Sequence, residues 1–148
     1  LGAFDLAESL QRALALLEPT IPPEITIERR FEPVPALEGW PRELNHAFMT
    51  VLQNAVQARD GVGVVSVETR ATEEHVLVRV RDTGRGMSEE EVTYLFDVAW
   101  SEDGSRTRMR LGLSAAYTTM QKHGGTMEIE SALGEGTTVT FRFPIPRA

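Results

Sequence analysis

Two valine-rich segments joined by a short polar turn constrain the fold of this chain more than any other feature. In both segments apolar and polar residues alternate, and a period of two places one set of side chains on each face of a β-strand. The alternating positions are Val65, Val67, Thr69, Val76, Val78 and Val80. The polar residues 72–74 between the segments are typical of a turn. The sequence therefore predicts an antiparallel hairpin, which ends at Asp82.

Helical spacing of apolar residues recurs in three other parts of the chain. In the first, Asp5 and Glu8 have the spacing of an N-terminal capping box. In the second, Pro41 suits the first turn of a helix. In the third, the glycines at 124–125 stop the pattern. The predicted helices run from Phe4 to Leu17, from Pro41 to the break at 60–61 and through Leu113 and Met120, with a shorter one from Ser88 to Phe96.

Three more strands and two long loops complete the predicted fold. Alternation predicts a strand from Ile25 to Phe31, and two final strands are joined by a glycine turn at 134–136. The stretches 32–40 and 97–110 are predicted loops, the second of them mobile. Helices and largely antiparallel strands in mixed order predict an α+β fold, namely a two-layer α/β sandwich with the helices on one face of the sheet.

Composition narrows the class of protein. A chain of 148 residues with 41% hydrophobic and 25% charged residues suits a single globular domain over 1–148. The net charge of -7 argues against a general surface for nucleic acid or anionic membranes. Because there is no cysteine and the three histidines are scattered, a Cys/His metal site is not expected. The chain starts at Leu1 without a methionine, so we expect it to be part of a longer protein.

Four short motifs follow one another along the chain, each at a predicted helix or strand boundary. They are Asn54-Ala55-Val56-Gln57-Ala58, Asp82-Thr83-Gly84-Arg85-Gly86, Leu111-Gly112-Leu113-Ser114 and Gly134-Glu135-Gly136-Thr137. In this order they resemble the nucleotide pocket of the GHKL ATP-binding family, specifically the catalytic domain of a sensor histidine kinase. The resemblance covers nearly the whole chain. It implies a fold of Bergerat type, with a mixed, mostly antiparallel sheet of about five strands covered on one face by about three helices.

The long helix carries a polar stripe beside its apolar face, formed by His46, Thr50, Asn54 and Gln57. An amide oxygen at the edge of a core can bind Mg²⁺, which is usually shared with substrate phosphates. The resemblance implies that Asn54 holds Mg²⁺ and that Gln57 lies at the nucleotide, whereas a solvated helix face is the alternative. Thr50 stands where gyrases and the large chaperones of the superfamily have a glutamate, and threonine cannot act as a base near neutral pH.

Asp82 is the residue that the resemblance places at the adenine. A carboxylate at the end of a strand can accept a hydrogen bond from the exocyclic amine of this base. Gly84 and Gly86 would let the backbone pass close to the base, Met87 would lie in the same pocket, and Thr137 would support Asp82 from a neighbouring strand. The alternatives are an ordinary turn after Asp82 and a β-branched strand residue at Thr137.

The loop 97–110 corresponds to the ATP lid of the family, and it departs from the family pattern. Three glycines usually precede the Leu-Ser of the second glycine box, and only Gly112 is kept here. Such turns present backbone N–H groups to phosphate at the start of a helix. The residues expected to contact phosphate are Leu111, Gly112 and Leu113, together with Arg106, Arg108 and Arg110. A solvated basic loop is the alternative for the arginines.

The resemblance implies a protein-histidine kinase that binds ATP with Mg²⁺ and transfers the γ-phosphoryl group in two-component signalling. The expected partners are its own upstream dimerisation domain, which supplies the phosphoacceptor histidine, and the receiver domain of a response regulator; no nucleic acid is expected. We expect a cytoplasmic location, a homodimeric parent whose membrane attachment is open, and a monomeric fragment. His123 is expected only to suit a helix C-terminus. Two alternatives remain: a degenerate domain that docks on partners with little or no nucleotide turnover, and an anti-sigma-factor serine kinase.

Overall fold

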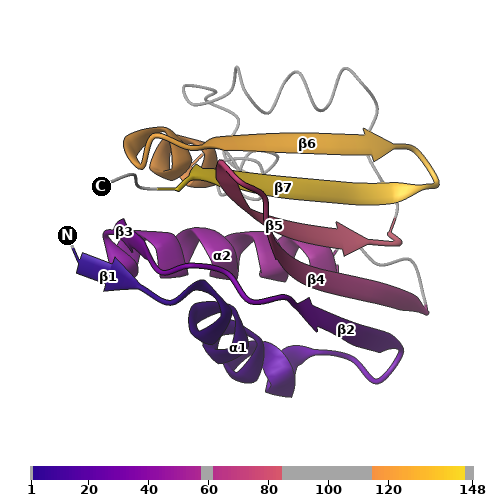
Figure 1. Ribbon diagram of the computed structural model, residues 1–148. Coiled ribbons are helices and arrows are strands. Elements are labelled where there is room, and N and C mark those ends of the chain that lie inside the picture. Colours follow the sequence, from indigo (N-terminus) through magenta and orange to yellow (C-terminus); the bar gives the residue numbers. More distant parts are fainter. Residues whose placement is uncertain (1, 58–61, 85–114, 146–148) are drawn as a thin grey trace, which may run out of the picture.

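The computed structural model describes residues 2–57, 62–84 and 115–145 (Figure 1). The elements of these ranges follow in the order β1 (Gly2–Phe4), α1 (Leu6–Leu17), η1 (Glu18–Thr20), β2 (Ile25–Phe31), β3 (Leu37–Gly39), α2 (Pro41–Gln57), β4 (Gly63–Ala71), β5 (His75–Asp82), β6 (Thr126–Ala132) and β7 (Gly136–Pro144). A further helical stretch covers 115–122. The predicted short helix 88–96 and the predicted loop 97–110 lie outside the described residues.

The main sheet has five strands in the order β2-β4-β5-β7-β6. β2 runs parallel to β4, and the other three neighbouring pairs are antiparallel. The predicted hairpin is confirmed as β4 and β5, in which buried and more exposed residues alternate. The predicted mixed, mostly antiparallel sheet is therefore confirmed.

The helices cover one face of this sheet, as predicted, and α1 packs against α2 (Figure 1). Phe48 of α2 lies at the centre of the core and is 1% exposed. Its ring centroid is 6.2 Å from that of Phe4, 5.3 Å from that of Phe141 and 6.3 Å from that of Phe143. One aromatic side chain thus joins the long helix to the entry strand β1 and to the strand β7.

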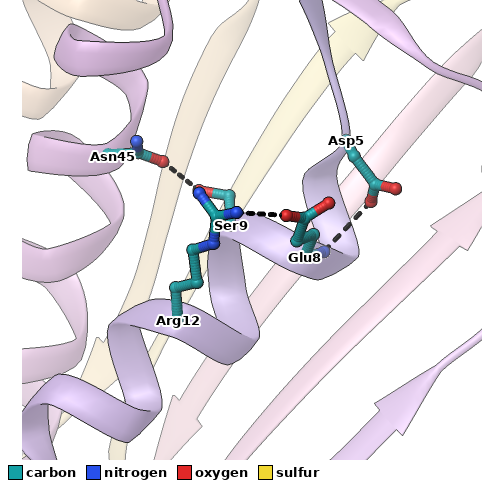
Figure 2. Close-up of polar contacts among 5 residues, drawn as sticks. All are labelled: Asp5, Glu8, Ser9, Arg12 and Asn45. Carbon is teal, nitrogen blue, oxygen red and sulfur yellow. Dashed lines mark hydrogen bonds and ion pairs between the residues drawn. The ribbon is translucent and has the colours of Figure 1, made fainter.

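The start of α1 follows the predicted cap, with one correction. Asp5 is the N-cap residue, and its Oδ1 accepts a hydrogen bond from the backbone N–H of Glu8 at 3.0 Å (Figure 2). Phe4, predicted as helical, belongs instead to the strand β1. Figure 2 also shows the side chain of Ser9 hydrogen-bonded to Asn45, which joins α1 to α2. With Asp5 as the N-cap, the helix begins at Leu6, two residues later than the apolar spacing suggested.

The predicted loop 32–40 also needs a correction, because Leu37–Gly39 forms the strand β3. This strand pairs with β1 in a separate two-stranded antiparallel sheet, with Phe4 opposite Leu37. Both strands have three residues, too few to show an alternating pattern, and their pairing is long-range. Within the described ranges, no helix is both long enough and apolar enough to cross a membrane.

Candidate functional site

Asp82 is a buried carboxylate at the end of β5, in the middle of the sheet. It pairs with Val65 of β4 on one side and with Thr137 of β7 on the other. The residue is 6% exposed, and its Oδ1 accepts a hydrogen bond from the backbone N–H of Gly84 at 2.8 Å. Burial raises the pKa of the Asp82 carboxyl, and hydrogen bonds with the backbone of Gly84 and Thr137 oppose this rise. The carboxyl group thus has main-chain partners and lies largely out of solvent.

The turn that follows Asp82 is fixed to β4 by a reciprocal pair of hydrogen bonds. The backbone N–H of Thr83 donates to the carbonyl oxygen of Val64 at 3.2 Å, and the N–H of Val64 donates to the hydroxyl of Thr83 at 3.0 Å. These bonds hold the chain in place as it leaves the sheet. Gly84, one of the predicted nucleotide residues, is buried directly beside the Asp82 carboxyl group.

Gly136, the first residue of β7, makes the closest approach to the backbone of Asp82. Its φ is +87°, and a Cβ added there would lie 2.1 Å from the Asp82 carbonyl oxygen and 3.1 Å from the Cα of Thr83. Any larger residue would therefore push β7 away from β5. Gly136 belongs to the glycine motif, but its role at the site cannot be predicted from the sequence, because this approach depends on the register of two distant strands.

Thr137 is placed beside Asp82 by the register of β5 and β7, and Ser131 of β6 holds its hydroxyl group. The Oγ of Ser131 lies 2.8 Å from the Oγ1 of Thr137 and donates to the carbonyl oxygen of Gly136 at 3.0 Å. Ser131 was not predicted from the sequence. A serine in a strand next to a glycine turn gives no signal of its own without the pairing partner.

Asn54 lies near the end of α2. The Nδ2 of its side chain is buried and has no hydrogen-bond partner among the residues that the structure describes. Only residues 58–62 separate the end of α2 from Gly63, the first residue of β4, and Val65 of that strand pairs with Asp82. Asn54 and Asp82 therefore lie toward the same end of the sheet, where β4 begins and β5 ends. Gln57 is the last residue of α2, and its backbone alone is described.

The remaining predicted residues fall outside the part of the chain that the structure describes. They are Gly86, Met87, Arg106, Arg108, Arg110, Leu111, Gly112 and Leu113. Their predicted roles at the base and at the phosphates stay predictions. Within the described residues, the chain brings together Asp82, Gly84, Gly136 and Thr137 at one strand end, with Asn54 on the neighbouring helix.

Comparison with known proteins decides the family. Residues 39–147 match the model of the family described as histidine kinase-, DNA gyrase B-, and HSP90-like ATPase. The chain belongs to this family. Within it, the chain corresponds to the catalytic ATPase domain of sensor histidine kinases, a member of the GHKL superfamily.

Relatives and solved structures agree with this assignment. The chain is 34% identical over 149 residues to the histidine protein kinase DivJ of Caulobacter vibrioides, covering 97% of this chain and 25% of that protein. It is 32% identical over 147 residues to the sensor histidine kinase ZraS of Klebsiella oxytoca, covering 97% of this chain and 31% of that protein. The structure of the mycobacterial sensor histidine kinase MprB aligns with a TM-score of 0.82 at 23% identity, covering 98% of each chain. The chain thus spans a third or less of these two curated relatives, and the solved structure has the same fold.

Proposed function

We propose that this domain binds ATP with Mg²⁺ and transfers its γ-phosphoryl group to a histidine of an associated dimerisation domain in two-component signalling. The observation that carries the proposal is the Asp82 carboxyl group, which is buried at a strand end. No ion pair to Asp82 occurs within the ranges that the structure describes, where its partners are main-chain groups. Burial of a carboxyl group costs free energy, and a ligand group that donates a hydrogen bond to Asp82 would offset part of that cost.

Adenine is a base that suits this carboxyl group. Its exocyclic amine donates hydrogen bonds, and a carboxylate is an acceptor whose bonds to donors are stronger than those of neutral groups. The Oδ1 of Asp82 is already held by Gly84, so the rest of the carboxyl group would receive the base. Thr137, fixed through Ser131, would support the same edge of the purine. Guanine has a carbonyl oxygen at this position, and this acceptor would face the acceptor oxygen of the Asp82 carboxylate.

Asn54 fits the role of a Mg²⁺ ligand shared with the phosphates. The Oδ1 of the Asn54 amide would be the atom that binds the cation, and its Nδ2 is buried. A neutral amide oxygen is a normal ligand for Mg²⁺, which retains several waters and takes much of its coordination from substrate phosphates. The absence of a cluster of three acidic or histidine ligands within the described residues is compatible with that mode. When bound, the ion would neutralise phosphate charge.

The chain's own residues would contribute binding and orientation, because phosphoryl transfer to a supplied nucleophile needs mainly positioning and charge neutralisation. We propose that Leu111, Gly112 and Leu113 present backbone N–H groups to the phosphates and that Arg106, Arg108 and Arg110 contact the phosphate oxygens. Gln57, Gly86 and Met87 would complete the nucleotide pocket. The partners would be the dimerisation domain and a response-regulator receiver domain, in a homodimeric cytoplasmic parent.

Calorimetric titration of the 148-residue chain with a non-hydrolysable ATP analogue, with and without Mg²⁺, tests the binding half of the proposal. We expect saturable binding that is tighter with Mg²⁺. Absence of binding at millimolar nucleotide would contradict the proposal and favour a docking domain without turnover. The transfer half is tested in the full-length parent, where acid-labile phosphate should appear on histidine; phosphate on serine would favour the serine-kinase alternative.

A further inference from the structure

His123 joins two parts of the chain that are far apart in sequence. Its Nδ1 lies 2.8 Å from the carbonyl oxygen of Thr119, in the last turn of the helical stretch 115–122, so this nitrogen carries the proton and donates. Its Nε2 accepts a hydrogen bond from the backbone N–H of Trp40 at 3.0 Å. The imidazole is therefore a bridge from the end of one helix to the residue directly before α2. Both ring nitrogens are used, which fixes the neutral tautomer.

The bridge is packed closely on the side of β3. A Cβ added at Gly39 would lie 2.8 Å from Cδ2 and 2.9 Å from Nε2 of His123. The rings of Trp40 and His123 meet edge to face, with centroids 5.2 Å apart and an interplanar angle of 81°. Gly39 is thus the residue that lets the imidazole reach the backbone of Trp40.

A second contact between the same two segments is weaker. The Nζ of Lys122 lies 2.9 Å from the Oε1 of Glu43 and 4.4 Å from the ring centroid of Trp40. Both charged side chains are more than 40% exposed, and ion pairs of this kind contribute little to stability. Of these two polar contacts, the imidazole bridge is therefore the better able to fix how the helix 115–122 sits relative to α2.

We propose that His123 is a positioning residue for the nucleotide site. In the sequence, the helix 115–122 comes one residue after Leu113, the last of the three residues proposed above to contact the phosphates. The C-terminal end of this helix is held by His123 to the segment that starts α2. Asn54, assigned to Mg²⁺, lies on that same α2. The bridge sets the relative placement of the two helices that would share the triphosphate. This inference rests on the proposed function.

Two substitutions separate the two hydrogen bonds of the bridge. In His123→Gln the side-chain oxygen can reach the position of Nε2 and still accept from Trp40, whereas in His123→Asn the shorter amide can still donate to Thr119 but does not reach Trp40. Loss of one ordinary hydrogen bond corresponds to about a fivefold change in an equilibrium constant. We therefore expect His123→Asn to weaken binding of the Mg²⁺ complex of a non-hydrolysable ATP analogue by about fivefold, because the binding-competent arrangement is less populated. His123→Gln should stay within about twofold of the unchanged chain.

Calorimetry measures the affinities, and thermal unfolding without nucleotide is recorded for each variant. His75→Asn is the matched control, since it makes the same exchange at a histidine whose side chain lies at the start of β5, and its affinity should not change. Gly39→Ala disturbs the bridge from the other side and should weaken binding in the same direction as His123→Asn.

Three outcomes are decisive. Weaker binding by His123→Asn with rescue by His123→Gln supports the positioning role. If His123→Asn lowers the unfolding temperature but the folded protein binds as tightly as the unchanged chain, His123 is only structural and the inference is wrong. If the unchanged chain binds no nucleotide, the proposed function fails and this inference fails with it.

Discussion

Replacing Asp82 with asparagine changes a single oxygen of a buried side chain into an N–H donor. The Oδ1 of Asp82 accepts from the Gly84 N–H at 2.8 Å, and we expect the one oxygen of the asparagine to keep that bond. The new NH₂ group then faces the position proposed for the adenine amine, so two donors oppose each other. A hydrogen bond to a charged group contributes about 1.5–3 kcal/mol, which corresponds to about 10- to 150-fold weaker binding of adenine nucleotide.

Calorimetric titration of Asp82→Asn with the Mg²⁺ complex of a non-hydrolysable ATP analogue measures this loss. Asp5→Asn is the matched control, because it makes the same exchange at an exposed helix cap where asparagine caps as well as aspartate. Its affinity should equal that of the unchanged chain. If Asp82→Asn also binds with unchanged affinity, the adenine assignment is refuted.

The same substitution should affect the empty protein in the opposite direction. Burial raises the pKa of Asp82 in the folded state above its ordinary value of 3.8, so the folded protein holds this proton more tightly than the unfolded chain. Stability from this group is therefore complete below that ordinary value and is lost as the pH rises through the folded pKa. Urea unfolding between about pH 4 and about pH 7 should show Asp82→Asn gaining stability relative to the unchanged chain as the pH rises. A difference that falls with pH would contradict the assigned cause.

Three further substitutions test other parts of the structure. Asn54→Ala should reduce the gain in nucleotide affinity on adding Mg²⁺, whereas the control Gln53→Ala should not, and an unchanged Mg²⁺ effect would count against a metal role. Asn54→Ala should also leave the empty protein no less stable, because it removes a buried N–H group that has no partner among the described residues. Gly136→Ala should lower the free energy of unfolding in urea more than Gly134→Ala does. Both glycines have a positive φ, but only a Cβ at position 136 would clash with the backbone of Asp82. Equal losses of about 1–2 kcal/mol would show that the close approach is absent. Phe48→Ala should lower the unfolding free energy by about 3–5 kcal/mol, and a loss below 1 kcal/mol would mean that the aromatic cluster is not the centre of the core.

Local patterns were enough to predict most of the sheet and the helices. Alternating valines predicted β4 and β5 because one face of each strand is buried, and Asp5 predicted the start of α1 because its side chain satisfies a backbone N–H of the first turn. β1 and β3 were not predicted, because each has three residues and forms a strand only by pairing with the other. Helices and strands with a local sequence pattern can thus be predicted from the sequence, and strands that form only by pairing with a distant segment cannot.

The candidate site divides in the same way. Asp82 and Asn54 could be proposed from motifs, since each lies at the end of a recognisable element. Contacts between distant parts of the chain define the roles of Gly136, Ser131 and His123. These contacts are the approach of β7 to β5, the hydroxyl pair between β6 and β7, and the hydrogen bond to Trp40. A serine or a histidine is compatible with many environments, so sequence alone could not select among them.

The central claim is that a carboxylate at the end of β5 reads the amine of adenine. Inosine triphosphate tests it most directly, because hypoxanthine differs from adenine chiefly in having a carbonyl oxygen where adenine has the amine. Calorimetry with the two triphosphates, both with Mg²⁺, should show that inosine triphosphate binds at least about tenfold more weakly than ATP, since Asp82 would then face an acceptor. Equal affinity for the two nucleotides would contradict the claim.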